Sequence, residues 1–380
     1  MNLAICARDI RGGLRSHLEL LLDQLEQDDG IGRVHLLSAT PTPFRGGKVV
    51  CHRIGVIGRS FMLREPWFIW RCSRRLKSLT GASAVDVIDV HQPALLRHPG
   101  VPAVYTVHIT HRQFSRKTHG GILGRGIGLA HRLYTGVDRR QMAVCDRVHF
   151  VSRRALESFA GRYPSLADKF VYIGNFFDEA RFHPLAHDRV QSFKRERGIA
   201  EDAFLLLFSG RLDPMKNIPG LLRAVERLRS QGDNIQLLVA GSGRLVGAVR
   251  RHAGCVYLGE LGAGALNLAY NAADLTVLPS ACENFPAVVL ESFAAGTPVL
   301  ATDVGDVARI LPSELILRDA SPETIAAAVR SFRRAETARV RSWVRDVGTR
   351  VRRDFSAGAL VRRKLDLYRQ LAVEAVARKR

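Results

Sequence analysis

Short β-rich runs alternate with amphipathic helical patterns along this 380-residue chain. The predicted strands are Asn2–Ala7, Arg33–Ser38, Val85–Val90, Pro102–Val107, Arg147–Ser152, Phe204–Ser209, Ile235–Ala240, Cys255–Leu258, Leu275–Pro279 and Pro298–Thr302. The clearest helical patterns between them are Leu14–Gln27, Ile218–Ser230 and Ala287–Ala295. Strands that alternate with helices form parallel sheets joined by crossover helices. The pattern therefore predicts an α/β protein with two doubly wound parallel sheets.

A polar, irregular stretch separates the two halves. Asp178–Asp202 contains Pro184 and Gly198, which favour loops, and is predicted to be a linker. A chain of this length suggests two domains. We expect a first Rossmann-like domain over residues 1–180 and a second over 200–355.

The charge is strongly positive, with 57 Lys and Arg against 36 Asp and Glu, or +21. The excess lies in residues 1–175 and 330–380, whereas residues 176–329 are slightly acidic. Such a field attracts polyanions or an anionic membrane surface. A nucleic-acid-binding protein is therefore one alternative, but the chain has no nucleic-acid-reading motif, and we expect no nucleic-acid partner.

Compartment and metal content are also constrained by the sequence. The longest run without Asp, Glu, Lys or Arg extends from His98 to His111, which is shorter than the ~20 residues of a membrane-spanning helix. The start shows no secretory signal pattern and the six cysteines form no C-x-x-C pair, so we expect a cytoplasmic protein with free thiols. The histidines, His91 included, show no metal-ligand spacing, and no metal site is predicted.

Ligands of doubly wound sheets bind outside the carboxyl ends of the strands, so the loops that follow strands deserve most weight. The first such loop contains Gly12-Gly13, before a helix. Glycine lets the backbone approach a phosphate at a helix N-terminus. Taken alone, this pair favours an ordinary turn, because glycine pairs are common in turns.

The second loop carries Arg211 and Lys216 between a strand and a helix. Two cations at a helix N-terminus oppose the helix dipole, but they suit a bound anion. Two solvated surface charges remain the alternative.

The third loop carries Glu283, and Glu291 follows eight residues later in the next helix. Glu291 lies among apolar residues, where a carboxylate is costly unless it meets hydroxyl or amide groups. Sugar and ribose hydroxyls are suitable partners, whereas an exposed helical glutamate is the alternative.

Together these motifs resemble glycosyltransferase family 4, whose two-domain GT-B enzymes use nucleotide sugars and retain the anomeric configuration. The resemblance is carried by Arg211, Lys216, Ala240–Gly243, Glu283, Glu291 and Gly296–Val299, and less strongly by Gly12-Gly13, Tyr105–His108, Cys145–Ser152 and Asn175–Asp178. The end of the chain, 356–380, resembles the family's last helix, which packs back on the first domain. The resemblance implies two Rossmann-like domains that face a cleft.

The resemblance also implies roles for individual residues. Arg211 and Lys216 would hold the donor diphosphate, Glu283 would contact donor-sugar hydroxyls, and Glu291 would bind the ribose. His108 would lie near the donor sugar and the acceptor. The remaining residues expected at the donor are Gly12, Gly13, Gly210, Gly241, Gly243, Asn284, Phe285 and Pro286.

The reaction implied by the resemblance needs no further cofactor. The two cations would replace a divalent metal, and the leaving phosphate would act as base for attack on the same face of the sugar. The family often has glycine after the first glutamate, where this chain has Asn284. Variants of this kind look similar to enzymes of surface-polysaccharide assembly. The implied function is transfer from a UDP- or GDP-linked sugar to a lipid-linked or glycan acceptor, in polysaccharide or lipopolysaccharide biosynthesis.

Two enzyme-related alternatives remain open. Gly241-x-Gly243-x-x-x-Gly247 is one residue longer than the dinucleotide fingerprint, and Glu260 lies at about the distance of a ribose contact, so an oxidoreductase is one alternative. A GT-B module without turnover is the other.

Two basic, partly apolar segments of the first domain suit the headgroup region of a bilayer. Residues expected on this membrane and acceptor side are Trp67, Trp70, Arg71, Arg74, Arg75, Lys77, Arg112, Arg116 and Lys117. They predict peripheral docking on the inner face of the cell membrane. A core-facing stripe with a solvated basic face is the alternative.

Overall fold

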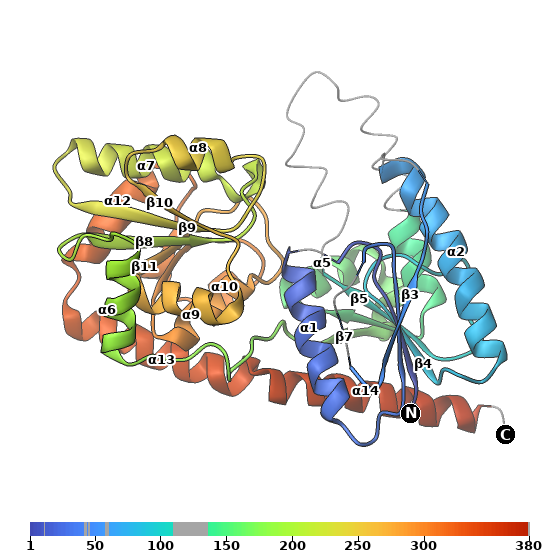
Figure 1. Cartoon of the computed structure of the whole chain (residues 1–380). Helices are drawn as coiled ribbons and strands as arrows, with labels where there is room; N and C mark the ends of the chain where they lie inside the picture. Colours follow the sequence, from blue (N-terminus) through green and yellow to red (C-terminus); the bar gives the residue numbers. More distant parts are fainter. Residues whose placement is uncertain (11, 42–43, 45, 58–60, 109–135, 379–380) are drawn as a thin grey trace. The chain divides into compact units, whose positions relative to one another are not determined.

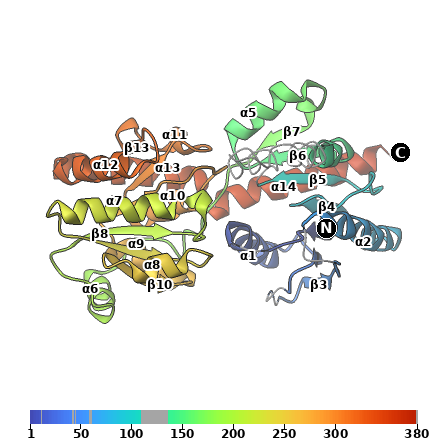
Figure 2. The same ribbon diagram turned by 90° about the horizontal axis from the view of Figure 1, so that it is seen from above.

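The computed structural model describes residues 1–10, 12–41, 44, 46–57, 61–108 and 136–378 (Figure 1). The chain forms two compact units: Met1–Gly174 with Gly358–Arg380, and Asn175–Ala357. Each unit contains one parallel sheet with helices packed on it (Figures 1 and 2). This is the predicted α/β architecture with two Rossmann-like sheets.

The first unit has a seven-stranded sheet in the order β3-β2-β1-β4-β5-β6-β7. Its strands are β1 (Leu3–Cys6), β2 (Val34–Ser38), β3 (Val49–Arg53), β4 (Val87–Val90), β5 (Ala103–Val107), β6 (Arg147–Phe150) and β7 (Phe170–Tyr172). Its helices include α1 (Gly12–Gln27), α2 (Phe61–Gly81) and α5 (Arg153–Arg162). The central strands β1, β4 and β5 are buried along their whole length, because helices cover both faces of a parallel sheet.

The second unit has a six-stranded sheet in the order β10-β9-β8-β11-β12-β13. Its strands are β8 (Phe204–Ser209), β9 (Ile235–Ala240), β10 (Cys255–Gly259), β11 (Leu275–Leu278), β12 (Val299–Thr302) and β13 (Ile316–Leu317). Its helices are α6 (His187–Glu196), α7 (Ile218–Ser230), α8 (Val246–Arg251), α9 (Ala263–Ala272), α10 (Ala287–Ala295), α11 (Val307–Ile310), α12 (Pro322–Arg334) and α13 (Thr337–Phe355).

Each sheet has one point where the order of the strands along the chain reverses. In the first unit it lies between β1 and β4, and in the second between β8 and β11. Loops diverge at such a point and leave a crevice outside the carboxyl ends of the strands. The loop that carries Arg211 follows β8, and the loop that carries Glu283 follows β11.

The last helix, α14 (Ala357–Ala377), belongs from Gly358 onward to the first unit. Its Lys364 and Tyr368 side chains are fully buried there. This confirms that the terminal helix packs back on the first domain. No described helix is long and apolar enough to cross a membrane.

Three strands were absent from the sequence-based prediction: β3, β7 and β13. All three lie at the edge of a sheet, where burial is partial and the apolar pattern is weak. The prediction of an irregular linker over Asp178–Asp202 was wrong in part, because it contains α6. Val190 and Phe193 of α6 are buried within the second unit, whereas the rest of the helix is polar and resembles a loop in composition.

Candidate functional site

The second-unit site begins with two cations on the loop after β8. Lys216 ends a short 3-10 turn that begins after Asp213, whose carboxylate accepts hydrogen bonds from the backbone N–H groups of Met215 and Lys216, at 3.0 and 3.3 Å. The Lys216 ammonium contacts the Glu283 carboxylate, and both side chains are largely buried. Arg211 is half exposed and lies 3.1 Å from Asp213. The loop therefore offers one anchored and one exposed positive charge.

Two glycine-containing loops pack backbone to backbone beneath these cations. Gly241 has a φ of +131°, and a side chain there would overlap the carbonyl oxygen of Gly210. The Leu212 N–H donates to the Ser242 carbonyl at 2.7 Å, which joins the loops after β8 and β9. The glycines are therefore needed for this close approach.

The same contacts weigh against a dinucleotide fingerprint. The space beside Gly241 is filled by the chain's own backbone and is not open to a pyrophosphate. Glu260, which the oxidoreductase alternative would place on a ribose, accepts a hydrogen bond from the Ser242 hydroxyl.

The loop that carries Glu283 is fixed by its neighbours. Asn284, Phe285 and Pro286 are buried, and the Asn284 carbonyl accepts from the Asp306 N–H at 3.1 Å. The Asn175 side-chain amide donates to the Phe285 carbonyl at 3.0 Å. Glu283 is thus followed by buried residues, 284–286, whose backbone carbonyls are hydrogen-bonded to Asp306 and Asn175.

Glu291 lies on α10, which begins after Pro286. Its carboxylate accepts a hydrogen bond from the Tyr270 hydroxyl at 2.9 Å. Burial raises the pKa of Glu291 to about 7, although the hydrogen bond from Tyr270 lowers it. The apolar surroundings expected from the sequence thus make this carboxyl group titrate near neutral pH.

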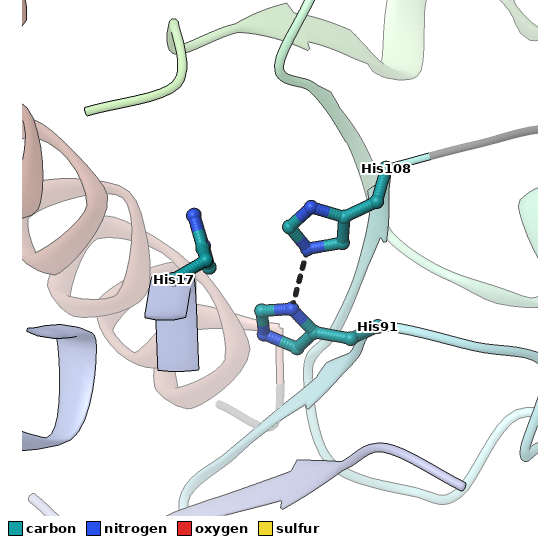
Figure 3. Close-up of side chains that lie close together, drawn as sticks. All are labelled: His17, His91 and His108. Atoms are coloured by element: carbon teal, nitrogen blue, oxygen red, sulfur yellow. Dashed lines mark hydrogen bonds between the residues drawn. The ribbon is translucent and has the colours of Figure 1, made fainter. Parts of the chain in front are cut away.

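In the first unit, three imidazole rings come together at the carboxyl ends of the strands (Figure 3). His17 comes from α1, His91 follows β4 and His108 follows β5. One ring nitrogen from each lies within 4.8 Å of the others, so the group could hold a metal ion. His91 Nδ1 and His108 Nε2 lie 2.7 Å apart, which is a hydrogen-bond distance. A proton therefore lies between these two nitrogens.

The glycines expected near the phosphates lie at the start of α1. Gly12 has a φ of +53°, and both Gly12 and Gly13 are exposed. Apart from its own helix and chain neighbours, no atom of the described residues lies within 4 Å of where a side chain of Gly13 would begin. The described part of the chain therefore leaves space beside the backbone at this helix start.

Sequence reasoning missed the polar network beneath His91. Asp89 is 1% exposed and accepts hydrogen bonds from Thr106 at 2.7 Å and Tyr368 at 2.5 Å. The Lys364 ammonium lies 2.8 Å from the same carboxylate. Burial raises the pKa of Asp89, but His91 and Lys364 outweigh burial and hold it well below its ordinary value. The pattern Asp89-x-His91 at the end of a buried strand was the available signal.

The predicted membrane-facing residues of α2 form a basic and aromatic surface. Arg71 stacks over Trp67 at 5.2 Å and Arg74 over Trp70 at 4.9 Å. Trp70 is 40% exposed, and Arg71, Arg74, Arg75 and Lys77 are exposed. We call Trp67, Trp70, Arg71, Arg74, Arg75 and Lys77 the α2 surface. The other expected members, Arg112, Arg116 and Lys117, lie outside the described residues.

Two family models match the chain. The model described as "Glycosyltransferase Family 4" matches residues 11–181, and the model described as "Glycosyl transferases group 1" matches residues 190–342. Together they cover the loops that carry Gly12, His108, Arg211, Lys216, Glu283 and Glu291.

Curated relatives are similar to the chain over much of its length. A glycosyltransferase of Methanocaldococcus jannaschii is 27% identical over 70% of this chain and 69% of its own length. The glycogen synthase of Mycobacterium tuberculosis is 30% identical over 71% of this chain and 68% of its own length. The GDP-mannose-dependent alpha-mannosyltransferase of Mycolicibacterium smegmatis is 30% identical, but the match covers only 58% of this chain and 56% of that protein.

Solved structures share the fold at lower identity. Sucrose-phosphate synthase from Thermosynechococcus elongatus superimposes with a TM-score of 0.80 at 19% identity, over 98% of this chain and 100% of the other. WaaG, a glycosyltransferase involved in lipopolysaccharide biosynthesis, gives 0.78 at 17% identity, over 96% and 99%. The family models, the relatives and the two parallel sheets agree: this chain belongs to glycosyltransferase family 4 and has the GT-B fold.

Proposed function

We propose that this protein is a retaining glycosyltransferase that moves a sugar from a UDP- or GDP-linked sugar to a lipid-linked or glycan acceptor, in the assembly of a cell-surface polysaccharide or lipopolysaccharide. The observation that carries the proposal is the group at the switch point of the second sheet. Lys216 and Glu283 are in contact there, and Arg211 lies on the same loop as Lys216.

The proposed chemistry follows from charge. Negative charge builds on the leaving diphosphate in the transition state, and fixed cations aimed at it lower the barrier. Arg211 and Lys216 take this role, Glu283 accepts hydrogen bonds from donor-sugar hydroxyls, and Glu291 accepts them from the ribose. The released phosphate oxygen takes the proton of the attacking hydroxyl.

A donor screen tests this function. The protein is incubated with a panel of UDP- and GDP-sugars and a glycan or lipid extract, and products are detected by mass, with saturation-transfer NMR for binding. We expect one nucleotide series to bind and one sugar mass to be transferred. Failure of every UDP- and GDP-sugar to bind would contradict the proposal, and tight binding of NAD or a flavin would favour the oxidoreductase alternative.

The α2 surface supports a second element of the proposal, reversible docking on an anionic membrane that presents the acceptor. Each basic residue near an anionic surface contributes about 1 kcal/mol, which salt removes. We expect co-sedimentation with phosphatidylglycerol vesicles at low salt and release at high salt. Phosphatidylcholine vesicles should not bind.

Two variants that each lose four positive charges distinguish membrane binding by the α2 surface from binding by the protein's overall positive charge. Replacement of Arg71, Arg74, Arg75 and Lys77 by Ser should abolish vesicle binding. Replacement of four exposed arginines of the second unit, Arg189, Arg195, Arg223 and Arg251, removes the same charge and should preserve most of it. Equal loss in both variants would show that the α2 surface is only a solvated basic face.

A further inference from the structure

The polar network of the first unit determines where protons lie on His91 and His108. Asp89 is the starting point, because an ionised carboxylate can only accept hydrogen bonds. It is surrounded by four donors: His91, Thr106, Lys364 and Tyr368. Lys364 is fully buried beside it, which supplies the countercharge that a buried carboxylate requires.

His91 comes next. Its Nε2 lies 2.9 Å from the Asp89 carboxylate and must carry a proton to make that hydrogen bond. Lys364, 2.8 Å from Asp89, already supplies the countercharge, so a neutral His91 ring completes the network without a second buried positive charge. Burial and the nearby Lys364 also lower the pKa of His91, although Asp89 opposes them. A neutral ring carries a single N–H, which leaves Nδ1 of His91 as an acceptor.

His108 completes the series. Its Nε2 lies 2.7 Å from Nδ1 of His91 and must therefore donate (Figure 3). Burial holds the pKa of His108 well below its ordinary value, and the neighbouring His17 and His91 add to this. A neutral His108 that is protonated at Nε2 has an unprotonated Nδ1.

We propose that Asp89 and His91 are positioning residues that hold His108 as the tautomer with an unprotonated Nδ1, which makes this nitrogen an acceptor, and not a donor, toward a sugar hydroxyl that reaches it. The sugar contact rests on the proposed function, whereas the proton positions rest on the network alone. Lys364 and Tyr368 come from α14, so the last helix of the chain fixes the ionised end of this network.

Histidine-selective 15N labelling of the full-length protein tests the proton positions directly. Long-range 1H–15N spectra distinguish protonated from unprotonated ring nitrogens, and the variants His91→Gln and His108→Gln assign the signals. We expect both rings to be neutral and protonated at Nε2 only. A proton on Nδ1 of His108, or on both of its nitrogens, would overturn the proposal.

A bound metal would overturn it as well. If the purified protein carried one equivalent of zinc and neither facing nitrogen were protonated, the cluster His17, His91 and His108 would be a metal site. Metal analysis of the same labelled sample distinguishes these two arrangements.

Two variants separate positioning from folding. His91→Phe removes the acceptor for His108 Nε2, so we expect a second His108 tautomer in the spectra and a kcat/KM about 10-fold lower, the size of one lost hydrogen bond. Tyr368→Phe removes one of the four donors to Asp89 and should leave the His108 tautomer unchanged. A single, unaltered His108 tautomer in a folded His91→Phe protein would refute the role of His91.

The spectra also separate this proposal from the proposed function. If the spectra show the expected tautomers but the protein transfers no sugar, the inference about the histidine network stands and the proposed transferase function is refuted. If the protein transfers sugar but His108 is protonated at Nδ1, the proposed transferase function stands and the inference about the histidine network is refuted.

Discussion

Glu291 should couple nucleotide binding to the release of a proton. Burial raises its pKa to about 7 from an ordinary value of 4.5, so at neutral pH about half of the free protein carries a proton on this carboxyl group. Ribose hydroxyls donate more strongly to the ionised carboxylate of Glu291 than to its protonated form. We therefore expect nucleotide binding to displace that proton and to become weaker as the pH falls below 7.

The magnitude follows from the fraction of ionised carboxyl. At pH 8 nearly all of Glu291 is ionised and binding is close to its maximum. At pH 7 the apparent Kd should be about 2-fold higher, and at pH 6 about 10-fold higher. About half a proton should be released per nucleotide at pH 7.

Calorimetry with UDP and GDP alone measures both effects. Titrations in buffers of different ionisation enthalpy give the number of protons released, and a series from pH 6 to 8 gives the slope of the affinity. The terminal phosphate of the nucleotide also titrates near pH 6, so a matched protein control is required.

Glu291→Gln is that control, because it keeps the size of the side chain and cannot ionise. It should bind the nucleotide more weakly at pH 8 and lose the proton release that belongs to Glu291, while any contribution from the phosphate persists. Glu283→Gln should retain both the nucleotide affinity and the proton release, and should mainly slow sugar transfer. Equal proton release by wild-type protein and Glu291→Gln would refute the reasoning.

Three further predictions concern the two cations Arg211 and Lys216, the packing of the loop at Gly241 and the buried ion pair of Lys364 with Asp89. Arg211→Ala or Lys216→Ala should reduce turnover by about 10²–10³, as expected for the loss of one preorganised charge donor. The melting temperature should change little for Arg211→Ala, whose side chain is half exposed, and should fall for Lys216→Ala, which leaves the largely buried Glu283 without its partner. Gly241→Ala should destabilise the second unit measurably in thermal melts, because its Cβ would overlap the Gly210 backbone at a φ of +131°. Lys364→Met should lower the free energy of unfolding by about 3–5 kcal/mol, because it leaves Asp89 as an uncompensated buried charge.

Each of these has a control within the chain. Near-normal turnover in both Arg211→Ala and Lys216→Ala would contradict their role in binding the diphosphate. Gly264→Ala, at a helix position with open space around it, should be neutral or stabilising, and equal loss in both glycine variants would contradict the packing argument. Arg378→Met breaks an exposed ion pair with Asp146 and should lower the free energy of unfolding by less than about 1 kcal/mol. An equally small decrease for Lys364→Met would show that the buried pair contributes no more to stability than an exposed one.

The sequence determined the architecture because most of the elements have a local signature. Largely apolar runs such as Phe204–Ser209 and Ile235–Ala240 became β8 and β9 with the predicted bounds, since a strand that is buried on both faces is mostly apolar. The edge strand β3 and the polar helix α6 lack that signature and were missed.

The sequence also gives candidate site residues, because ligand-binding loops follow the strands of such sheets. Arg211, Lys216, Glu283 and Glu291 are predicted by residue type and by place along the chain. Their partners could not be identified, since the contact of Lys216 with Glu283 depends on β8 and β11 being neighbours in the sheet.

The tertiary structure alone decided the network around Asp89. Its partners lie on β5, after β4 and on α14, and Tyr368 is 279 residues away along the chain. Local periodicity specifies which segments are strands and helices, but it does not specify the order of the strands or the place where the last helix returns. A buried carboxylate becomes interpretable only when that packing brings Lys364 and His91 to it, and with them the proton positions on His108.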